Sequence, residues 1–199
     1  MKDDNVFNIF PTPIYLTSLD NTFVNVFNKF NFIKQKNFGN YTSDNNFILN
    51  NKKFNKLNKE ILKHVNYYLY NVLCYKDIKP YITQSWLNYT SKDEYHHIHS
   101  HANSLISGVL YIKAIKEIDS ITFEKTYHNV ISPNIEKYNL YNSPSWFFPV
   151  ETNNLILFPS NLKHFVTTKN DTSERISLAF NVFVKGTLGT KNNLTYLKL

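Results

Sequence analysis

Histidines gather in one short stretch of the sequence, Tyr95-His96-His97-Ile98-His99-Ser100-His101. Imidazole is the commonest protein ligand of metal ions near neutral pH. On an extended backbone, side chains two residues apart point to the same side. His97 with His99, or His99 with His101, could therefore hold one ion, whereas His96 is predicted to face away. A histidine cluster can also be incidental and bind metal only adventitiously.

A third candidate ligand lies about sixty residues further along the chain. The stretch 154–164 reads as an apolar strand, a turn at Pro159, and then His164 at the start of another strand. A ligand from a distant strand would complete a facial set of three and leave other metal positions open. This second element strengthens the prediction of a metal site built from His164 and one of the two histidine pairs.

A charged residue follows within an apolar segment. Arg175 begins the run Arg175-Ile176-Ser177-Leu178-Ala179-Phe180-Asn181. An arginine in an apolar strand needs a partner, because burying an unpaired charge is costly. That partner could be a carboxylate of the chain. We favour a carboxylate ligand held by the guanidinium fork, with Ser177 on the same strand face as a further donor.

The elements that must position these residues fall into two halves. Apolar residues at helical spacing predict one helix from Asp20 or Asn21 to near Gly39, and a clearer one over about 55–73. Such amphipathic helices usually pack against a sheet. The helical support is therefore expected over about 20–75.

After Pro80 the hydrophobic period changes to two. The predicted strands are 81–89, 104–113, 120–124, 146–151, 154–158, 163–168 and 175–185. Short strands after two helices predict a mainly β antiparallel sandwich or barrel, with its core over about 80–185. The longest predicted loop, 125–144, is a candidate for substrate contacts. No repeat or composition break divides residues 1–199, so a single domain is expected.

Composition narrows the classes of protein. The 199 residues are 42% hydrophobic and include one cysteine, which excludes disorder, an intrachain disulfide and a cysteine-based zinc site. No apolar run is long enough to span a bilayer and the start is polar, so a cytoplasmic protein is expected. The net charge is +7, but the lysines are scattered among Asn, Ile, Tyr and Phe. Nucleic acid is therefore not expected as a partner.

Four motifs in this order resemble a known family. They are His99-Ser100-His101, then 107–111 (Ser-Gly-Val-Leu-Tyr), then 158–164 (Phe-Pro-Ser-x-x-x-His), then 174–181 (Glu-Arg-Ile-Ser-x-x-Phe-Asn). In this order and spacing they resemble the 2-oxoglutarate- and Fe(II)-dependent oxygenases found in bacteriophages and marine bacteria, as does the opening segment 9–15. The resemblance implies a double-stranded β-helix, a jelly roll related to cupins, in a bacterial or phage-infected cytoplasm.

The resemblance also implies roles for single residues. His99 and His164 would ligate iron, and Arg175 would hold the distal carboxylate of 2-oxoglutarate with help from Ser177. The wider superfamily has a carboxylate where this chain has His101, whereas the resembling family generally has histidine there. A carboxylate ligand from Asp93 or Glu94 is a weaker alternative, because neither has the two-residue spacing to His99.

The implied reaction uses dioxygen to convert 2-oxoglutarate to succinate and CO2 and to hydroxylate a substrate. Asn88 and Tyr111 are expected as further contacts of the cosubstrate, and Phe123, Trp146 and Phe158 as candidate pocket walls. The substrate, a small molecule or a peptide with a prolyl or other side chain, is left open, as is the oligomeric state. The alternatives are a cupin-type metal-binding protein and a non-enzymatic β-sandwich module.

Overall fold

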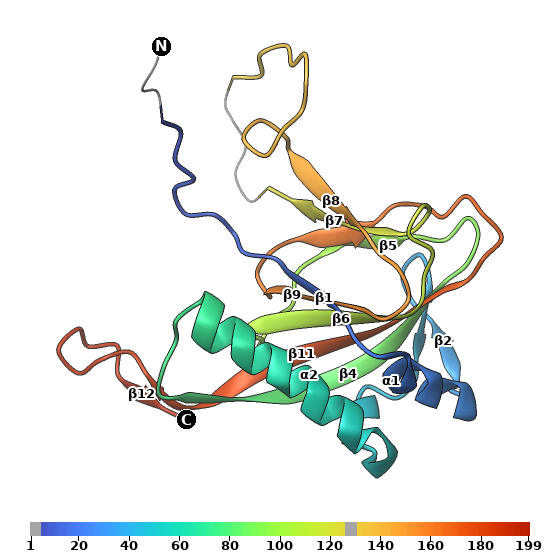
Figure 1. The fold of residues 1–199 in the computed structure, drawn as a ribbon, viewed down its shortest axis with the longest axis horizontal. Coiled ribbons are helices and arrows are strands. Elements are labelled where there is room, and N and C mark those ends of the chain that lie inside the picture. The colour runs from blue at the N-terminus through green and yellow to red at the C-terminus, as the bar shows by residue number, and fades with distance from the viewer. Residues whose placement is uncertain (1–4, 126–130) are drawn as a thin grey trace.

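Two antiparallel β-sheets face each other in the computed structural model, which describes residues 5–125 and 131–199 (Figure 1). The larger sheet has the order β1 (Tyr15–Ser18), β9 (Asn154–Pro159), β6 (Ile106–Lys113), β11 (Arg175–Leu188), β4 (Ile78–Thr90), β3 (Tyr41–Ser43), β2 (Lys34–Lys36), and β12 (Leu197–Lys198) pairs with β11. The smaller sheet has the order β5 (His96–His99), β10 (His164–Val166), β7 (Ser120–Glu124), β8 (Ser145–Pro149).

The path of the chain between the sheets defines the fold. From β4 to β11 it passes from the larger sheet to the smaller and back, except that β7 and β8 are consecutive in the smaller sheet. β4 and β11 pair along nearly their whole length, from Thr90 opposite Arg175 to Ile78 opposite Gly186. This arrangement is a double-stranded β-helix, or jelly roll, and confirms the predicted fold class.

Helices cover the outer face of the larger sheet. The main one is α2 (Asn55–Tyr67), continued by one π-helical turn, η4 (Tyr68–Val72), and it lies across β4, β11 and β6 (Figure 1). Leu57, Ile61 and Val65 recur at helical spacing and are fully buried against the sheet. The helix predicted over 55–73 is therefore confirmed.

The first predicted helix is much shorter than expected. Helical structure is limited to α1 (Asn21–Asn25) and the 3-10 turn η1 (Val26–Lys29), and two further 3-10 turns, η2 (Ile48–Asn50) and η3 (Lys52–Phe54), precede α2. The helix to Gly39 is wrong because the backbone is extended at Phe30, whose ring packs 5.0 Å from that of Phe54. The following β2 and β3 form a hairpin on β4, so the segment 20–75 contributes strands as well as helices.

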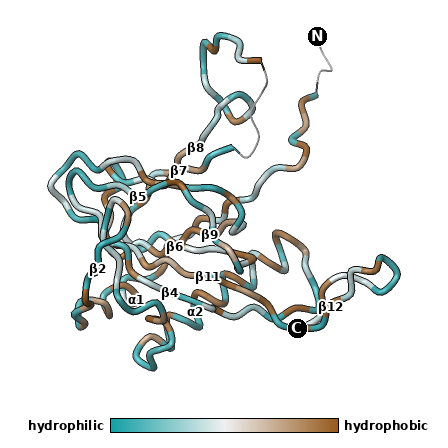
Figure 2. Tube along the Cα trace, turned by 180° about the vertical axis from the view of Figure 1, so that it is seen from behind, coloured by the Kyte–Doolittle hydropathy of each residue, from teal (hydrophilic) through white to brown (hydrophobic). Residues whose placement is uncertain are grey.

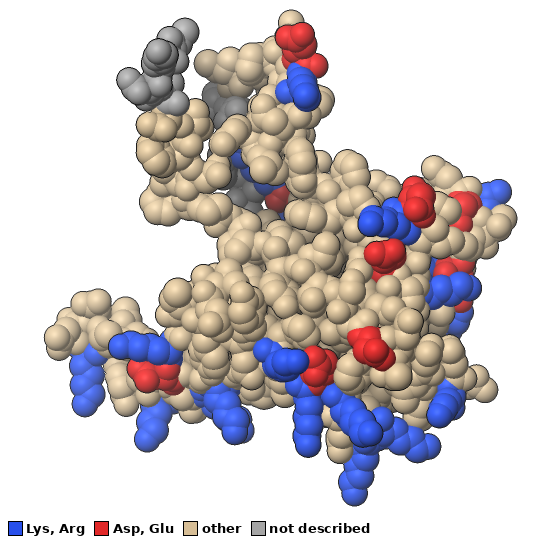
Figure 3. Space-filling model, in the orientation of Figure 1, with Lys and Arg blue, Asp and Glu red and all other residues tan. Residues whose placement is uncertain are grey.

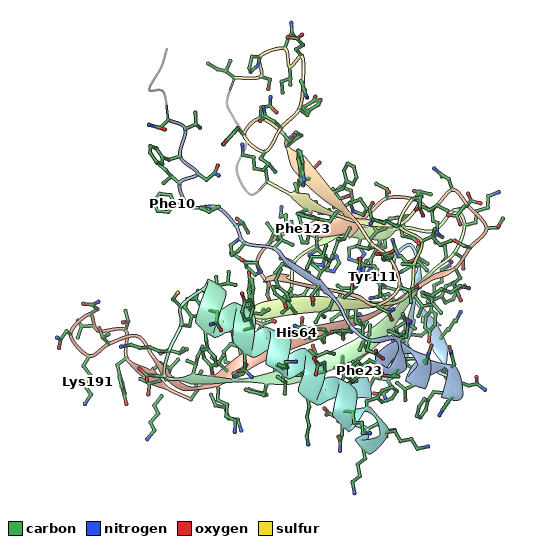
Figure 4. All side chains as sticks on the ribbon, in the orientation of Figure 1. Phe10, Phe23, His64, Tyr111, Phe123 and Lys191 are labelled. Atoms are coloured by element: carbon green, nitrogen blue, oxygen red, sulfur yellow. The ribbon has the colours of Figure 1, made fainter. Side chains whose placement is uncertain are left out.

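Alternation along the central strands produces two separate cores. On β6, Leu110 faces the helices, whereas Val109 and Tyr111 face the space between the sheets. The inner core also contains Phe123 from β7, which lies with Tyr111 between the two sheets (Figure 4). The inner face of the jelly roll is therefore where polar residues of the central strands must find partners.

The seven predicted strands are all present, with ends shifted by a few residues, as β4 and β6 to β11. The sequence patterns missed the short strands β1, β2, β3, β5 and β12. Of the predicted loop 125–144, residues 126–130 lie outside the described residues, and 131–144 form no helix or strand. No helix in the described part of the chain is long and apolar enough to cross a membrane.

Two surface features stand apart from the fold core. Lysines line the face below α2, including the exposed Lys56, Lys59 and Lys63 (Figure 3). The segment before β1 extends away from the sheets and exposes hydrophobic residues, among them Phe7 and Phe10 (Figure 2).

Candidate metal centre

Three histidine side chains converge between the two sheets. His99 ends β5, His101 follows two residues later, and His164 begins β10. One ligand nitrogen from each residue lies within 4.8 Å of the other two. His99 and His164 are paired across the strands with ring centroids 4.4 Å apart, and His101 lies 5.1 Å from each. The three residues that the sequence singled out thus form one group of donors able to bind a metal ion.

Hydrogen bonds orient each of these rings through the same nitrogen. Nδ1 of His99 lies 2.8 Å from the carbonyl oxygen of His97, and Nδ1 of His164 lies 3.1 Å from that of Leu162. Nδ1 of His101 is bonded to the side-chain oxygen of Asn181 on β11. Because these oxygens can only accept, each Nδ1 must carry the proton. Each Nε2 is left with its lone pair, as a metal ligand requires.

Burial keeps these imidazoles in the neutral form. It lowers the pKa of His99 to about 4 and that of His164 to about 3. Burial also lowers the pKa of His101, although the hydrogen bond to Asn181 opposes the shift. Neutral imidazole is the ligand form, so the group is ready to bind metal at neutral pH.

Arg175 lies on the inner face of the same fold, at the start of β11. Only 4% of the residue is exposed, and a guanidinium nitrogen donates to Thr90 Oγ1 at 3.1 Å. Within residues 5–125 and 131–199, no carboxylate forms an ion pair with Arg175. The sequence left open whether a carboxylate of the chain or a ligand neutralises this charge, and the structure offers no such carboxylate.

The other predicted polar residues line one cavity with Arg175 and the histidines. Ser177 lies two residues beyond Arg175 on the same strand face, and Tyr111 faces it from β6. Asn88 lies opposite Ser177 on β4 and is 6% exposed, and its Oδ1 has no partner among the described residues. Burial raises the pKa of the Tyr111 hydroxyl, which therefore remains a neutral donor.

One residue predicted to face away lies in the cavity instead. His96 lines it together with His99, His101 and His164. The reason is a β-bulge: His99 pairs with His164 and His96 with Val166, so three steps along β5 match two along β10. The extra residue reverses the alternation and brings His96 to the inner side.

The other candidate ligands, His97, Asp93 and Glu94, do not belong to the group of three histidines, among the described residues searched. His97 is on the outside of the cluster, where its ring contacts that of Phe38 edge to face. Glu94 Oε2 accepts the backbone N–H of Ser91 within the β4–β5 turn. Neither Asp93 nor Glu94 joins the group of three histidines, among the described residues searched.

Phe123 and Phe158, which were predicted as pocket walls, do not line the cavity, whose apolar wall is formed by Trp86, Val109, Ile121, Phe165, Val166 and Ala179. Phe158 packs 4.7 Å from the ring of His164 and Phe123 lies 6.1 Å from it, so both belong to the inner core beside the site. Trp146 is 38% exposed on β8 and does not line the cavity. Trp86, which the sequence analysis did not select, does so and lies 5.6 Å from the His101 ring.

Comparison with known proteins places these residues in context. A family model described as "Putative 2OG-Fe(II) oxygenase" matches residues 84–181, a range that contains the three histidines and Arg175. A search of curated proteins gives no match.

Solved structures share the fold at low sequence identity. HygX from Streptomyces hygroscopicus, solved with nickel, 2-oxoglutarate and hygromycin B, is 12% identical, with a TM-score of 0.61 over 86% of this chain and 82% of that one. The epimerase SnoN from nogalamycin biosynthesis is 10% identical, with a TM-score of 0.61 over 86% and 78%. A 2OG-Fe(II) oxygenase family protein from Burkholderia pseudomallei is 11% identical, with a TM-score of 0.51 over 76% and 72%.

Proposed function

We propose that this chain, residues 1–199 as one domain, is a 2-oxoglutarate- and Fe(II)-dependent oxygenase that hydroxylates a small-molecule or peptide substrate. One observation carries the assignment: three neutral imidazoles and a buried guanidinium without a carboxylate partner line the same cavity. The match of residues 84–181 to the oxygenase family model supports it. The phage or marine-bacterial origin and the cytoplasmic location belong to the same proposal and rest on the sequence resemblance.

The residues of the cavity fit both groups that this reaction needs. His99, His101 and His164 offer three nitrogen donors, which suits Fe(II), and a facial set leaves positions for the keto acid and dioxygen. Arg175 is a match for a carboxylate, because its buried charge has no carboxylate partner among the described residues, and its one hydrogen-bond partner there is the neutral Thr90 hydroxyl. Bound together, Fe(II), 2-oxoglutarate and dioxygen supply oxidative decarboxylation to succinate and CO2, coupled to hydroxylation of a C–H bond.

The protein contributes position and electrostatics. The Nδ1 hydrogen bonds hold the three imidazoles with their Nε2 atoms free, so little reorganisation accompanies metal binding. Arg175 attracts the distal carboxylate in a site where burial strengthens the interaction. Ser177, Tyr111 and Asn88 add neutral hydrogen-bonding groups along the cavity between the guanidinium and the histidines.

Three neutral ligands also affect the charge of the site. A two-histidine, one-carboxylate set would reduce the charge of Fe(II) by one unit, whereas three imidazoles leave it unchanged. The dianionic cosubstrate is therefore attracted by the metal at one end of the cavity and by Arg175 at the other. This arrangement favours tight binding of a dicarboxylate keto acid.

The reaction at the substrate can take more than one form in this fold. HygX is solved with hygromycin B, and SnoN is described as an epimerase of nogalamycin biosynthesis. Both descriptions name a small molecule, which favours a small-molecule substrate for this chain as well. Hydroxylation is the outcome we propose for this chain, and proline-containing peptides are the second group of substrates to test.

Anaerobic titration of the Fe(II)-loaded protein with 2-oxoglutarate tests this function without knowledge of the substrate. We expect a weak visible charge-transfer band when the keto acid chelates iron. Arg175→Ala should keep the metal but weaken 2-oxoglutarate at least about tenfold, because a charged hydrogen-bonding partner is lost. Lys163→Ala, an exposed charge next to His164, is the control and should change neither.

The same titration distinguishes the alternatives. Iron binding without a band would favour a cupin-type metal protein and reject the oxygenase. No metal binding at all would mean that the histidines are incidental and that the chain is a binding or structural module. Circular dichroism of each variant shows whether Arg175→Ala is folded, since loss of the fold would mean that the arginine is structural.

A further inference from the structure

His96 is the fourth histidine that lines the cavity, and it has no role in the metal site or in the carboxylate site at Arg175. The bulge in β5 turns it inward, next to Val166, which lines the cavity as well. Its ring stacks on that of His99, with centroids 4.6 Å apart and an angle of 17° between the planes. The bulge therefore fixes both the direction of this side chain and the plane of its ring.

His96 is not one of the metal donors. The group of ligand nitrogens within 4.8 Å of one another comprises His99, His101 and His164 only, among the described residues searched. Unlike the rings of these three, the ring of His96 makes no hydrogen bond with any residue in the described ranges. Its ring thus offers a free donor and a free acceptor to whatever occupies the cavity.

The position of His96 relative to Arg175 indicates what that occupant is. Val166, the strand partner of His96, borders the cavity beside Arg175, one step beyond the pair formed by His99 and His164. His96 and Arg175 line this cavity together. His96 therefore faces the part of the cavity between the metal donors and the guanidinium.

The chemistry of this part of the cavity suits an anion. Arg175, Tyr111 and Ser177 all present donors there, and the imidazole of His96 carries at least one N–H in either protonation state. A cosubstrate held by both the histidines and Arg175 would lie in the cavity that this ring lines. A carboxylate oxygen is the strongest acceptor that such a molecule brings.

We propose that His96 is a binding residue for 2-oxoglutarate, whose carboxylate accepts a hydrogen bond from the imidazole N–H in addition to the fork of Arg175. This inference rests on the proposed function, because it concerns the cosubstrate of that reaction. It assigns the bulge in β5 a role, which is to place a fourth histidine over the cosubstrate without adding a fourth metal ligand.

Three variants separate the donor from the ring. His96→Phe keeps an aromatic ring to stack on His99 but removes the N–H, whereas His96→Gln keeps a donor at a similar distance from the backbone. His64→Phe is the control, because it makes the same exchange on α2, outside the cavity. Anaerobic calorimetry with Fe(II) and then with 2-oxoglutarate measures the affinity for each, independently of turnover.

We expect His96→Phe to weaken 2-oxoglutarate about tenfold, as for loss of a hydrogen bond to a charged group, and to leave the Kd for Fe(II) unchanged. His96→Gln should restore most of the affinity, and His64→Phe should behave as the wild type. If His96→Phe does not fold, His96→Leu removes the N–H at similar volume and should give the same loss.

Two results would overturn the inference. Unchanged 2-oxoglutarate affinity in a folded His96→Phe or His96→Leu variant would show that the imidazole makes no such contact. Loss of Fe(II) affinity together with that of 2-oxoglutarate would show that His96 acts through the metal site instead. Failure of the wild type to bind 2-oxoglutarate would reject the proposed function, and the role of His96 with it. This outcome is distinguishable, because the wild type is measured before any variant.

Discussion

At the scale of single residues, the candidate site depends on side chains that hold the metal donors as well as on the donors themselves. Asn181 is the clearest example. Its Oδ1 accepts from His101 Nδ1 and also from Ser107 Oγ at 3.3 Å, and the residue is 6% exposed. His101 is the only one of the three donors oriented by a side chain rather than by a backbone carbonyl. Its orientation is therefore the most open to change by mutation.

Replacing Asn181 with alanine should weaken metal binding by roughly ten- to a hundredfold, the usual cost of losing a partner of a metal-binding histidine. The matched variant Asn181→Asp keeps an acceptor for His101 and should retain most of the affinity. Calorimetry with Fe(II) under anaerobic conditions measures both. Equal affinities of Asn181→Ala and the wild type would show that the hydrogen bond does not position His101.

The sequence identifies the donors of the candidate metal site, but it does not identify Asn181 as the residue that orients His101. His99 and His101 are recognisable from their spacing, and Arg175 from its charge within an apolar run. Asn181 was part of a motif but carried no assigned role, because its contact with His101 spans 80 residues. Such a contact depends on which strands become neighbours, which periodicity along one segment does not specify.

At the scale of elements, most of the strands that could be predicted are apolar segments of five or more residues, and β6, β9 and β11 among them are buried on both faces. The period of two identified β4 and β6 to β11, and the period of 3.6 identified α2. The bulge in β5 could not be predicted, because a bulge is a property of two paired strands rather than of one sequence. For the same reason the interior position of His96 became visible only in the structure.

One buried lysine joins three of the loops at the Arg175 end of the jelly roll. Lys169 precedes β11 and is 5% exposed, and its Nζ lies 2.9 Å from Asp119 Oδ1 in the β6–β7 connection and 2.7 Å from Asp171 Oδ2. Its backbone N–H donates to the carbonyl of Glu94, and its carbonyl accepts from Asp93, in the β4–β5 turn. The loop that leads into Arg175 is thereby fixed to two others.

Lys169→Met should lower the free energy of unfolding by about 3 to 5 kcal/mol, because Asp119 would remain buried without its cation. Chemical denaturation monitored by circular dichroism measures the change. Adding Asp119→Asn removes the unpaired charge while keeping an acceptor for the Ile115 N–H, so the double variant should recover part of the loss. A double variant as unstable as Lys169→Met would contradict this account.

At the scale of the whole molecule, the buried histidines link stability to pH. Burial lowers the pKa of His96 to about 2 and that of His164 to about 3, below the value of 6.5 for an exposed histidine. Below pH 6.5 the unfolded chain binds protons that the folded chain does not, so acid favours unfolding. The metal-free protein is therefore expected to be most stable above this pH.

When the pH is lowered from about 7.5 to about 5, the free energy of unfolding should fall by on the order of 2 kcal/mol for each of His96 and His164. The lowered pKa of Asp171 has no part in this range, because the stability that it contributes is lost only below the ordinary carboxyl pKa. Urea unfolding with a chelator at the two pH values measures the difference. The His164→Asn variant should show a smaller difference in the free energy of unfolding between the two pH values. Equal stability of the wild type at both pH values would refute the link between these histidines and acid unfolding.

The hydrogen bond between His101 and Asn181 also bears on how this site can evolve. A histidine codon becomes an aspartate codon through one nucleotide change, which would give a two-histidine, one-carboxylate ligand set. Aspartate at position 101 would, however, meet the Asn181 oxygen, one acceptor facing another. Turning the amide over would break the hydrogen bond that Asn181 Nδ2 donates to Gln84 Oε1. Lineages with either ligand set are therefore separated by more than one substitution, and positions 101 and 181 are expected to change together.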